Sequence, residues 1–193
     1  MRDYHGIIFA YHDEPALRDL TANRTAASLP FCSRYRLIDF ALSSLRNAGI
    51  LDVGVIMQRD YQSLLDHIGS SKAWDMSRKS GGLRMLPPFG LPQYHTGNYN
   101  GTMEALNAVG AYLRDSSAES VIMMLGNTAA NVDLSAAIRK YEESGAEALA
   151  ICMDHIPMGV HHRYLTDSEG FVNGMNLYRS KKPYFYINLG YEF

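Results

Sequence analysis

Short, nearly unbroken runs of apolar residues recur along this chain and constrain its fold more than any other feature. Four of them stand at Gly6–Tyr11, Val53–Met57, Ser120–Leu125 and Ala148–Met153. Apolar runs of this length are typical of strands that are buried on both faces. Such strands occur in parallel sheets, because the crossover connections place helices on both sides of the sheet. The chain is therefore predicted to form a parallel sheet.

The segments between these runs have the periodicity of amphipathic helices. Leu37, Ala41 and Leu45 recur at helical spacing, and Gly49 behind them suits a helix C-cap. Three further helices are predicted at Tyr61–Ile68, Gly101–Leu113 and Leu134–Tyr141. A loop rich in Gly and Pro is predicted from Ser77 to Asn100. This alternation predicts an α/β fold, a Rossmann-like, mostly parallel sheet with helices on both faces, which binds ligands at the carboxyl ends of its strands.

Length and composition narrow the class of protein. A chain of 193 residues with 47% hydrophobic and 20% charged residues is predicted to form one globular domain over residues 1–193. The net charge of −2 provides no electrostatic footprint for nucleic acid. No apolar run approaches the roughly 18 residues of a membrane span. We therefore expect neither nucleic acid nor membrane as a partner. Cys32 and Cys152 are expected to be free thiols in the reducing cytoplasm.

Several ordered motifs point to one family. Pro30–Ile50 contains PF-x-x-x-YRLIDF followed by S-x-x-x-N-x-GI. Other motifs are VIMQRDYQSLLDHI at Val55–Ile68, YNGTMEA at Tyr99–Ala105, MLGNTAANVDL at Met124–Leu134 and INLGYEF at Ile187–Phe193. Together they resemble the sugar-nucleotide pyrophosphorylases, most closely glucose-1-phosphate adenylyltransferase (ADP-glucose pyrophosphorylase). The resemblance implies the fold of nucleotide-diphospho-sugar transferases, and a family chemistry that uses ATP, glucose 1-phosphate and Mg²⁺.

The positions that carry this chemistry hold other residues here. The lysine of the family's R-x-K-P-A pattern falls on Ala26, and the metal carboxylate of L-A-G-D falls on Asn127. The family's phosphate loop, L-A-G-G-x-G-x-R, aligns with residues 9–16. Its glycines fall on Tyr11, His12 and Glu14, and its arginine on Ala16. Losing one preorganised electrostatic contact typically costs about 10²–10³ in rate. We therefore expect no catalytic residue, no metal site and no bound cofactor, with Ala16, Ala26 and Asn127 as vestigial catalytic positions.

Three residues match positions at which the family contacts the nucleotide: Gln58, Gly101 and Thr102. They are candidates for vestigial nucleotide binding. Simpler interpretations stay open, because Gln58 could be a polar strand terminus, and Gly101 and Thr102 an ordinary loop and N-cap.

Three further residues near the expected site are polar or charged. Asp133 is expected to cap a helix rather than to bind metal. Arg18 and Arg24 are the nearest cations that could replace the missing ones, but neither is in register with the family pattern. We therefore expect no catalytic role for them.

The motif YQSLLDH-x-GS-x-x-x-WD-x-SR-x-x-GGL, at Tyr61–Leu83, is similar to the regulatory D-type subunits of the bacterial enzyme. The resemblance implies a non-catalytic regulatory subunit in glycogen biosynthesis that associates with a catalytic subunit. Two alternatives remain open, a weakly active nucleotidyltransferase and a nucleotide- or sugar-phosphate-binding module without a partner. The family continues past the strand at Ile187–Phe193 into a left-handed β-helix. We expect an incomplete domain without that β-helix, either a natural truncation or a fragment of a longer product.

Overall fold

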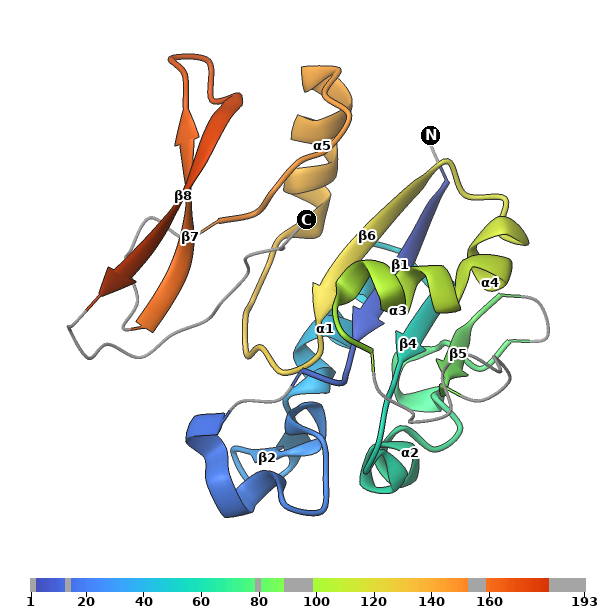
Figure 1. Ribbon diagram of the computed structural model, residues 1–193. Helices are drawn as coiled ribbons and strands as arrows, with labels where there is room; N and C mark the ends of the chain where they lie inside the picture. The colour runs from blue at the N-terminus through green and yellow to red at the C-terminus, as the bar shows by residue number, and fades with distance from the viewer. Residues whose placement is uncertain (1–2, 13–14, 79–80, 89–98, 153–158, 181–193) are drawn as a thin grey trace.

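The computed structural model describes residues 3–12, 15–78, 81–88, 99–152 and 159–180 (Figure 1). The predicted strand at Ile187–Phe193 lies outside these residues. The elements in chain order are β1 (Tyr4–Phe9), the 3₁₀ turns η1 (Pro15–Thr21) and η2 (Ala26–Ser28), β2 (Pro30–Phe31), β3 (Tyr35–Arg36), α1 (Ile38–Asn47), β4 (Val53–Ile56), α2 (Gln62–Ile68), the 3₁₀ turn η3 (Lys72–Trp74), β5 (Leu83–Leu86), α3 (Thr102–Ala108), α4 (Gly110–Arg114), β6 (Ser120–Leu125), α5 (Leu134–Ser144), β7 (Gly159–Thr166) and β8 (Val172–Ser180).

Within the described residues, four parallel strands form the central sheet, in the order β5-β4-β1-β6. β1 lies in the interior of the sheet, where it pairs with β4 from Gly6↔Val53 to Phe9↔Ile56 and with β6 from Tyr4↔Ser120 to Phe9↔Leu125. Because all four strands run in the same direction, their carboxyl ends meet at one edge of the sheet. The predicted parallel sheet is confirmed, and three of its predicted strands correspond to β1, β4 and β6.

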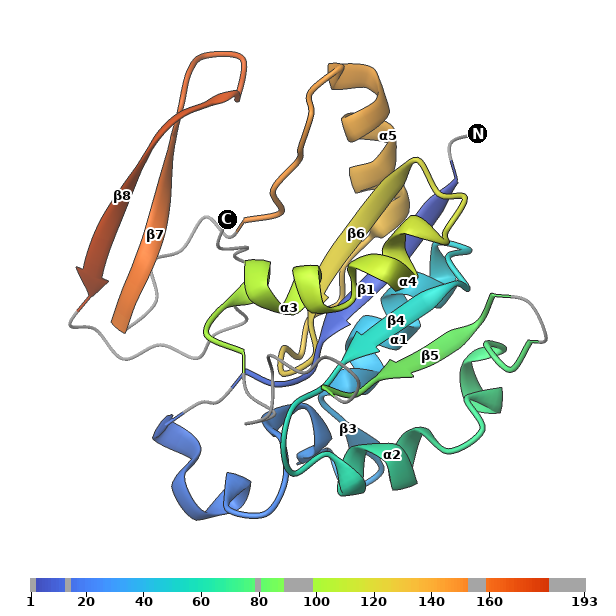
Figure 2. The ribbon, with the colours of Figure 1, turned by 45° about the vertical axis from the view of Figure 1, so that its right-hand side comes forward.

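Helices cover both faces of this sheet, as predicted. α3 and α4 lie on one face, and α1 and α5 on the other (Figures 1 and 2). Alternate side chains of β1 point to opposite faces of the sheet. Ile8 packs with α1, whereas Ile7 and Phe9 pack with α3. A fully buried side chain of this size contributes about 1.5–3 kcal/mol. The alternation explains why the apolar run of β1 is unbroken.

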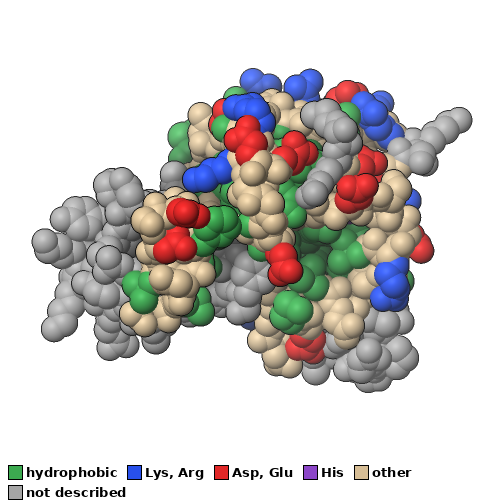
Figure 3. Space-filling view, turned by 90° about the horizontal axis from the view of Figure 1, so that it is seen from above, with side chains coloured by type: hydrophobic (Ala, Val, Ile, Leu, Met, Phe, Trp, Pro, Cys, Tyr) green, Lys and Arg blue, Asp and Glu red, His purple; other side chains and the backbone are tan. Residues whose placement is uncertain are grey.

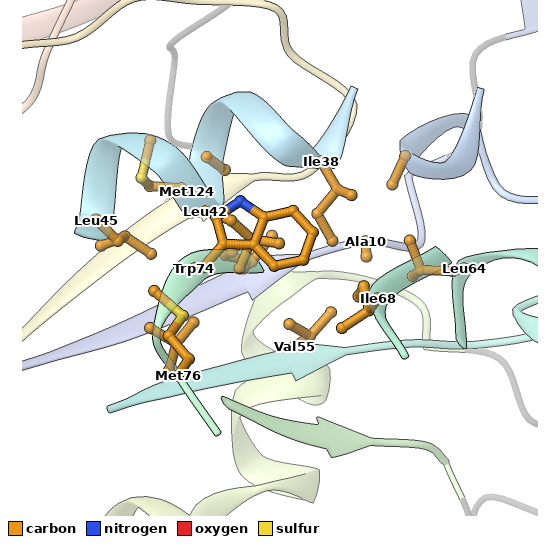
Figure 4. Packing of buried hydrophobic residues seen from close by; sticks show 14 of the residues in the cluster. Ala10, Ile38, Leu42, Leu45, Val55, Leu64, Ile68, Trp74, Met76 and Met124 are labelled. Carbon is orange, nitrogen blue, oxygen red and sulfur yellow. The ribbon is translucent and has the colours of Figure 1, made fainter. Parts of the chain in front are cut away.

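Trp74 lies in the larger of the two cores, beneath α1. Its indole packs among side chains from α1, α2 and β4, which include Leu42, Ile68 and Val55 (Figure 4). Only 8% of Trp74 is exposed. The tryptophan therefore belongs to the core and anchors the segment that leads into β5.

Three details differ from the sequence prediction. β5 lies inside the segment that was predicted to be a loop, and it pairs in parallel with β4 from Val53↔Leu83 to Ile56↔Leu86. The helix predicted at Gly101–Leu113 is two helices, because Val109, just before Gly110, has φ −99° and ψ 12°. The strand predicted at Ala148–Met153 is absent over residues 148–152, and Met153 lies outside the described residues. Apolar side chains of that segment instead line a cavity of about 330 Å³ with β6 and α5.

The strands β7 and β8 form a separate antiparallel hairpin, paired from Gly159↔Ser180 to Thr166↔Val172. Seen from above, acidic, basic and hydrophobic side chains are mixed over the surface (Figure 3). Cys32 and Cys152 are both exposed free thiols, as predicted. Among the described residues, no helix is long and apolar enough to cross a membrane.

Candidate functional site

The carboxyl ends of β1 and β4 form the edge at which a parallel sheet of this kind binds ligands. Backbone bonds continue past both strands, because Ala10 N donates to Ile56 O at 2.9 Å and Met57 N donates to Leu86 O at 3.1 Å. The next residues along the chain, Tyr11 and Gln58, are thereby brought to the same place.

A cavity of about 220 Å³ opens at this edge. Its lining residues are Tyr11, Arg18, Thr21, Ala22, Arg24, Thr25, Gln58, Arg59 and Asp60. Three guanidinium groups and one carboxylate make this lining cationic. The cavity also brings together two segments that the sequence separates, the η1–η2 region and the end of β4.

Aromatic side chains fill the space above the end of β1. The Tyr11 ring stacks on His12 with a centroid distance of 4.7 Å and meets the Tyr99 ring edge-on at 5.6 Å. Only 8% of Tyr11 is exposed. Burial raises the pKa of Tyr11 to about 12, although the neighbouring Thr102 side chain acts in the opposite direction. Tyr11 is therefore a neutral phenol, and it lies where the predicted alignment has a glycine of the family pattern.

Gln58 is buried at the end of β4, and its Nε2 donates to Tyr99 O at 3.3 Å. The amide group is thus engaged by the backbone of the segment that leads into α3. Gln58 also lines the cationic cavity. It is the one candidate nucleotide-binding residue that the structure brings there.

The other two nucleotide-binding candidates lie where α3 begins. Gly101 is the exposed N-cap residue of the helix, and Thr102 is its first residue. The Glu104 carboxylate accepts a hydrogen bond from Asn100 N at 2.7 Å, which supports this helix start. Thr102 is near Tyr11, but neither Gly101 nor Thr102 lines the cavity.

The three vestigial catalytic positions are dispersed. Ala16 is exposed on η1, whereas Ala26 is completely buried in η2. Asn127 follows β6 after Gly126, and its Oδ1 is buried without a hydrogen-bond partner among the described residues. A Cβ on Gly126 would lie 3.2 Å from both Ala27 Cβ and Phe9 O, so the backbone at this turn packs tightly against β1. None of the three positions lines the cavity.

Asp133 caps α5, because its Oδ1 accepts a hydrogen bond from Ala136 N at 3.0 Å. This confirms the capping interpretation. Among the described residues, no three His, Cys, Asp or Glu side chains gather in a group that could hold a metal ion.

Sequence reasoning gave Arg18 and Arg24 no role, yet both line the cavity. The family alignment could not find them, because it compares positions along the chain and neither arginine is in register with a catalytic residue. The turns η1 and η2 bring them to the end of β4. The clustering of Arg18, Arg24 and Arg59 near the predicted strand ends was the available signal.

The parallel α/β sheet with helices on both faces is that of a nucleotidyltransferase domain. The chain belongs to the nucleotidyl transferase family, whose profile matches residues 15–163. It is 32% identical over 149 residues to the glycogen biosynthesis protein GlgD of Bacillus subtilis, which covers 77% of this chain and 43% of that protein. The corresponding protein of Geobacillus stearothermophilus is 36% identical over 146 residues, 76% of this chain and 42% of that protein.

Relatives also include the glucose-1-phosphate adenylyltransferase of Thermotoga neapolitana, 34% identical over 154 residues. That alignment covers 78% of this chain and 36% of the enzyme. The chain thus spans less than half the length of these relatives. These alignments relate the chain to both GlgD proteins and adenylyltransferases.

Proposed function

We propose that this chain is a non-catalytic, regulatory partner of a glucose-1-phosphate adenylyltransferase in glycogen biosynthesis. The observation that carries the proposal is the buried Tyr11 ring at the carboxyl end of β1. In the family pattern this position belongs to a glycine of the phosphate loop. A nucleotide could bind there as in the family only if the packed rings of Tyr11, His12 and Tyr99 were displaced.

The charges that phosphoryl chemistry requires are also missing from their usual places. Ala26 carries no charge where the family has a lysine, and Asn127 offers only an amide where the family has a metal carboxylate. Each such contact is worth about 10²–10³ in rate. Their effects are not additive, but the joint loss leaves little turnover. A chain that lacks these catalytic groups can still function by associating with an active partner.

The similarity of this chain to known proteins supports a catalytic adenylyltransferase as its partner. The matches to GlgD proteins and to glucose-1-phosphate adenylyltransferases cover similar shares of this chain, between 76% and 78%. A chain with the fold of the enzyme and a filled site can bind beside the enzyme through surfaces that related subunits share. The proposed partner is therefore the catalytic adenylyltransferase itself, and the complex a hetero-oligomer.

The test is ADP-glucose formation from ATP and glucose 1-phosphate with Mg²⁺. Three samples are compared: this chain alone, a catalytic adenylyltransferase alone, and the two mixed. A fourth sample contains the enzyme with an equal mass of the thermally unfolded chain, which controls for nonspecific protein effects. We expect no product from the chain alone and a changed rate or effector response only in the folded mixture.

Turnover by the chain alone would overturn the non-catalytic part of the proposal. A folded mixture that behaves like the enzyme alone, and two proteins that elute separately on gel filtration, would overturn the partnership.

A further inference from the structure

We propose that this chain associates head to tail with a second copy of itself, the turn of the β7–β8 hairpin docking on the β2–β3 hairpin. The docking end is called the acidic tip and comprises Leu165, Asp167, Glu169, Phe171, Val172 and Met175. The receiving surface is called the aromatic patch and comprises Phe31, Arg34 and Tyr35. The inference goes beyond the proposed function, because it concerns copies of this chain and requires no catalytic subunit.

Large hydrophobic side chains are concentrated around the acidic tip. Val172 and Met175 are 54% and 50% exposed, and Leu165 and Phe171 are exposed as well. β7 and β8 form a two-stranded sheet of their own, and an isolated hairpin is only marginally stable in water. Exposed hydrophobic side chains that cluster in this way mark protein interaction sites.

The acidic charges of the tip lie in an ordered turn. Asp167 Oδ1 accepts hydrogen bonds from Glu169 N and Phe171 N, both at 2.9 Å. Gly170 has φ 88°, a conformation that glycine adopts without strain. Asp167 and Glu169 are exposed, and no cationic side chain among the described residues pairs with either carboxylate. The turn therefore presents two negative charges beside hydrophobic side chains, and both kinds lie together over this hairpin in Figure 3.

The aromatic patch exposes the complementary combination of side chains. Phe31 pairs with Tyr35 across the two strands, so both rings point to the same face. Tyr35 is 51% exposed, and Phe31 is exposed although its ring meets that of Phe40 edge-on at 5.3 Å. Arg34, in the turn between the strands, is exposed, and no carboxylate among the described residues pairs with its guanidinium. Aromatic rings and arginine are the side chains that protein interfaces favour, and this set suits an apolar partner that carries carboxylates.

The two surfaces lie at opposite ends of the molecule. The turn of the β7–β8 hairpin is at the top and the β2–β3 hairpin at the bottom in both ribbon views (Figures 1 and 2). One folded copy therefore does not bring its own tip to its own patch. The tip of one copy can contact the patch of the next, which covers hydrophobic side chains of both and places Arg34 beside acidic groups. Because the two surfaces differ, the contact is heterologous and can continue from copy to copy.

The experiment is sedimentation velocity of the full chain alone over a concentration series, at low and at high salt. We expect the mass to rise with concentration, and the association to weaken at high salt because exposed charges are screened. Phe171→Ser and Tyr35→Ser each remove one contacting ring and should each raise the dissociation constant about tenfold or more. Met103→Ser changes an exposed side chain on α3, outside both surfaces, and should leave the association unchanged.

A mixture of the two defective variants tests the head-to-tail arrangement. The Phe171→Ser variant keeps an intact aromatic patch, and the Tyr35→Ser variant keeps an intact acidic tip. We expect the mixture to form heterodimers through one unaltered contact, at a concentration at which neither variant associates alone. Such a rescue also shows that both variants are folded.

A charge exchange tests the attraction between the acidic tip and Arg34. Glu169→Arg and Arg34→Glu should each weaken the association. The variant that carries both substitutions should recover it, because opposite charges then face one another again.

A chain that stays monomeric at every concentration in low salt would overturn the proposal. So would a mixture of the Phe171→Ser and Tyr35→Ser variants that stays monomeric, a charge exchange without recovery, or an equal loss of association in the Met103→Ser control. Failure of this contact leaves the proposed partnership intact, since that is measured only with the catalytic subunit present.

Discussion

His67 Nε2 lies 2.6 Å from Asp39 Oδ1, and this contact ties α2 to the start of α1. The other oxygen of Asp39 accepts from Arg36 N at 3.0 Å. Arg36 in turn reaches α2, where its guanidinium donates to Ser63 Oγ at 2.6 Å and to Ser63 O at 2.7 Å. Residues of the motifs YRLIDF and YQSLLDHI thus form one scaffold. The scaffold explains how the sheet edge keeps its shape when the chemistry at that edge has changed.

The contact between Asp39 and His67 should contribute to stability. Asp39→Ala leaves His67 and Arg36 N without their acceptor in a partly buried place, and we expect the free energy of unfolding to fall by about 1–3 kcal/mol. The measurement is urea unfolding of Asp39→Ala, His67→Ala and the double variant. We expect the two losses to be less than additive, because they share one interaction.

Asp66→Ala serves as the matched control for that cycle. Asp66 is exposed on the same helix and accepts from Gln62 Nε2 at 2.9 Å. A surface substitution of this kind should change stability by no more than about 0.5 kcal/mol. Fully additive losses for Asp39→Ala and His67→Ala would refute the coupling.

Stability should decline in mild acid because of His5. Burial lowers the pKa of His5 below its usual 6.5, against the opposing effect of the Asp52 carboxylate, while Arg84 lowers it further. Below pH 6.5 the unfolded chain takes up a proton that the folded chain does not bind. The contribution is therefore present above pH 6.5 and is lost as the pH falls, with a limiting slope of about 1.4 kcal/mol per pH unit.

The measurement for His5 is the free energy of unfolding between pH 7.5 and 5 (roughly the range in which histidine titrates). The His5→Gln variant should show a smaller dependence over this range, because the titrating group is gone. Identical slopes for the two proteins would assign the acid sensitivity to other groups.

Two glycine-to-alanine substitutions should act in opposite directions. A Cβ on Gly54 in β4 would lie 2.6 Å from Tyr112 Cε1 and 2.8 Å from Leu86 Cδ1. We expect Gly54→Ala to cost about 1–3 kcal/mol through overpacking. At Gly110, the first residue of α4, the nearest atom is the mobile Arg114 Nη1 at 3.1 Å. Gly110→Ala should therefore stabilise the helix by about 0.5–1 kcal/mol. Thermal unfolding of both variants checks the signs.

Restoring the two charged groups alone should not restore turnover. In the Ala26→Lys, Asn127→Asp double variant, the Tyr11 and His12 rings still fill the end of β1. A lysine at the fully buried Ala26 also has to find space in the core, so we expect a lower unfolding temperature. The assay is ADP-glucose formation with Mg²⁺. Measurable product would mean that the aromatic rings do not exclude the nucleotide.

Much of the sheet could be predicted because its strands are apolar on both faces. β1, β4 and β6 have that pattern, and the helices between them show clear periodicity. β5 was missed because its residues, LRML, include an exposed arginine and follow Gly81 and Gly82 in a segment rich in turn-forming residues. β5 forms because it pairs with β4 and because Trp74 anchors the segment before it. Neither contact can be predicted from the residues of β5 alone.

The segment Ala148–Cys152 shows the opposite failure. Its apolar composition is that of a strand, but pairing depends on backbone hydrogen bonds that composition does not report. For the site, alignment placed Gln58 near the sheet edge, yet it could not show that Tyr99 O engages the amide. Nor could spacing along the chain reveal that Arg18 and Arg24 share a cavity, since that depends on the irregular path of η1 and η2.

The central place of β1 has a consequence for the order of folding during synthesis. Its partner β6 begins only at Ser120, so the parallel pairing Tyr4↔Ser120 closes a loop of more than a hundred residues. At a ribosomal rate of about 5–20 residues per second, roughly 6–23 seconds separate the emergence of the two strands. The apolar residues Ile7, Ile8 and Phe9 lack that neighbour throughout this interval. The nascent chain is thus most exposed to misassociation early, before β6, the last of the described strands of the central sheet, has left the ribosome.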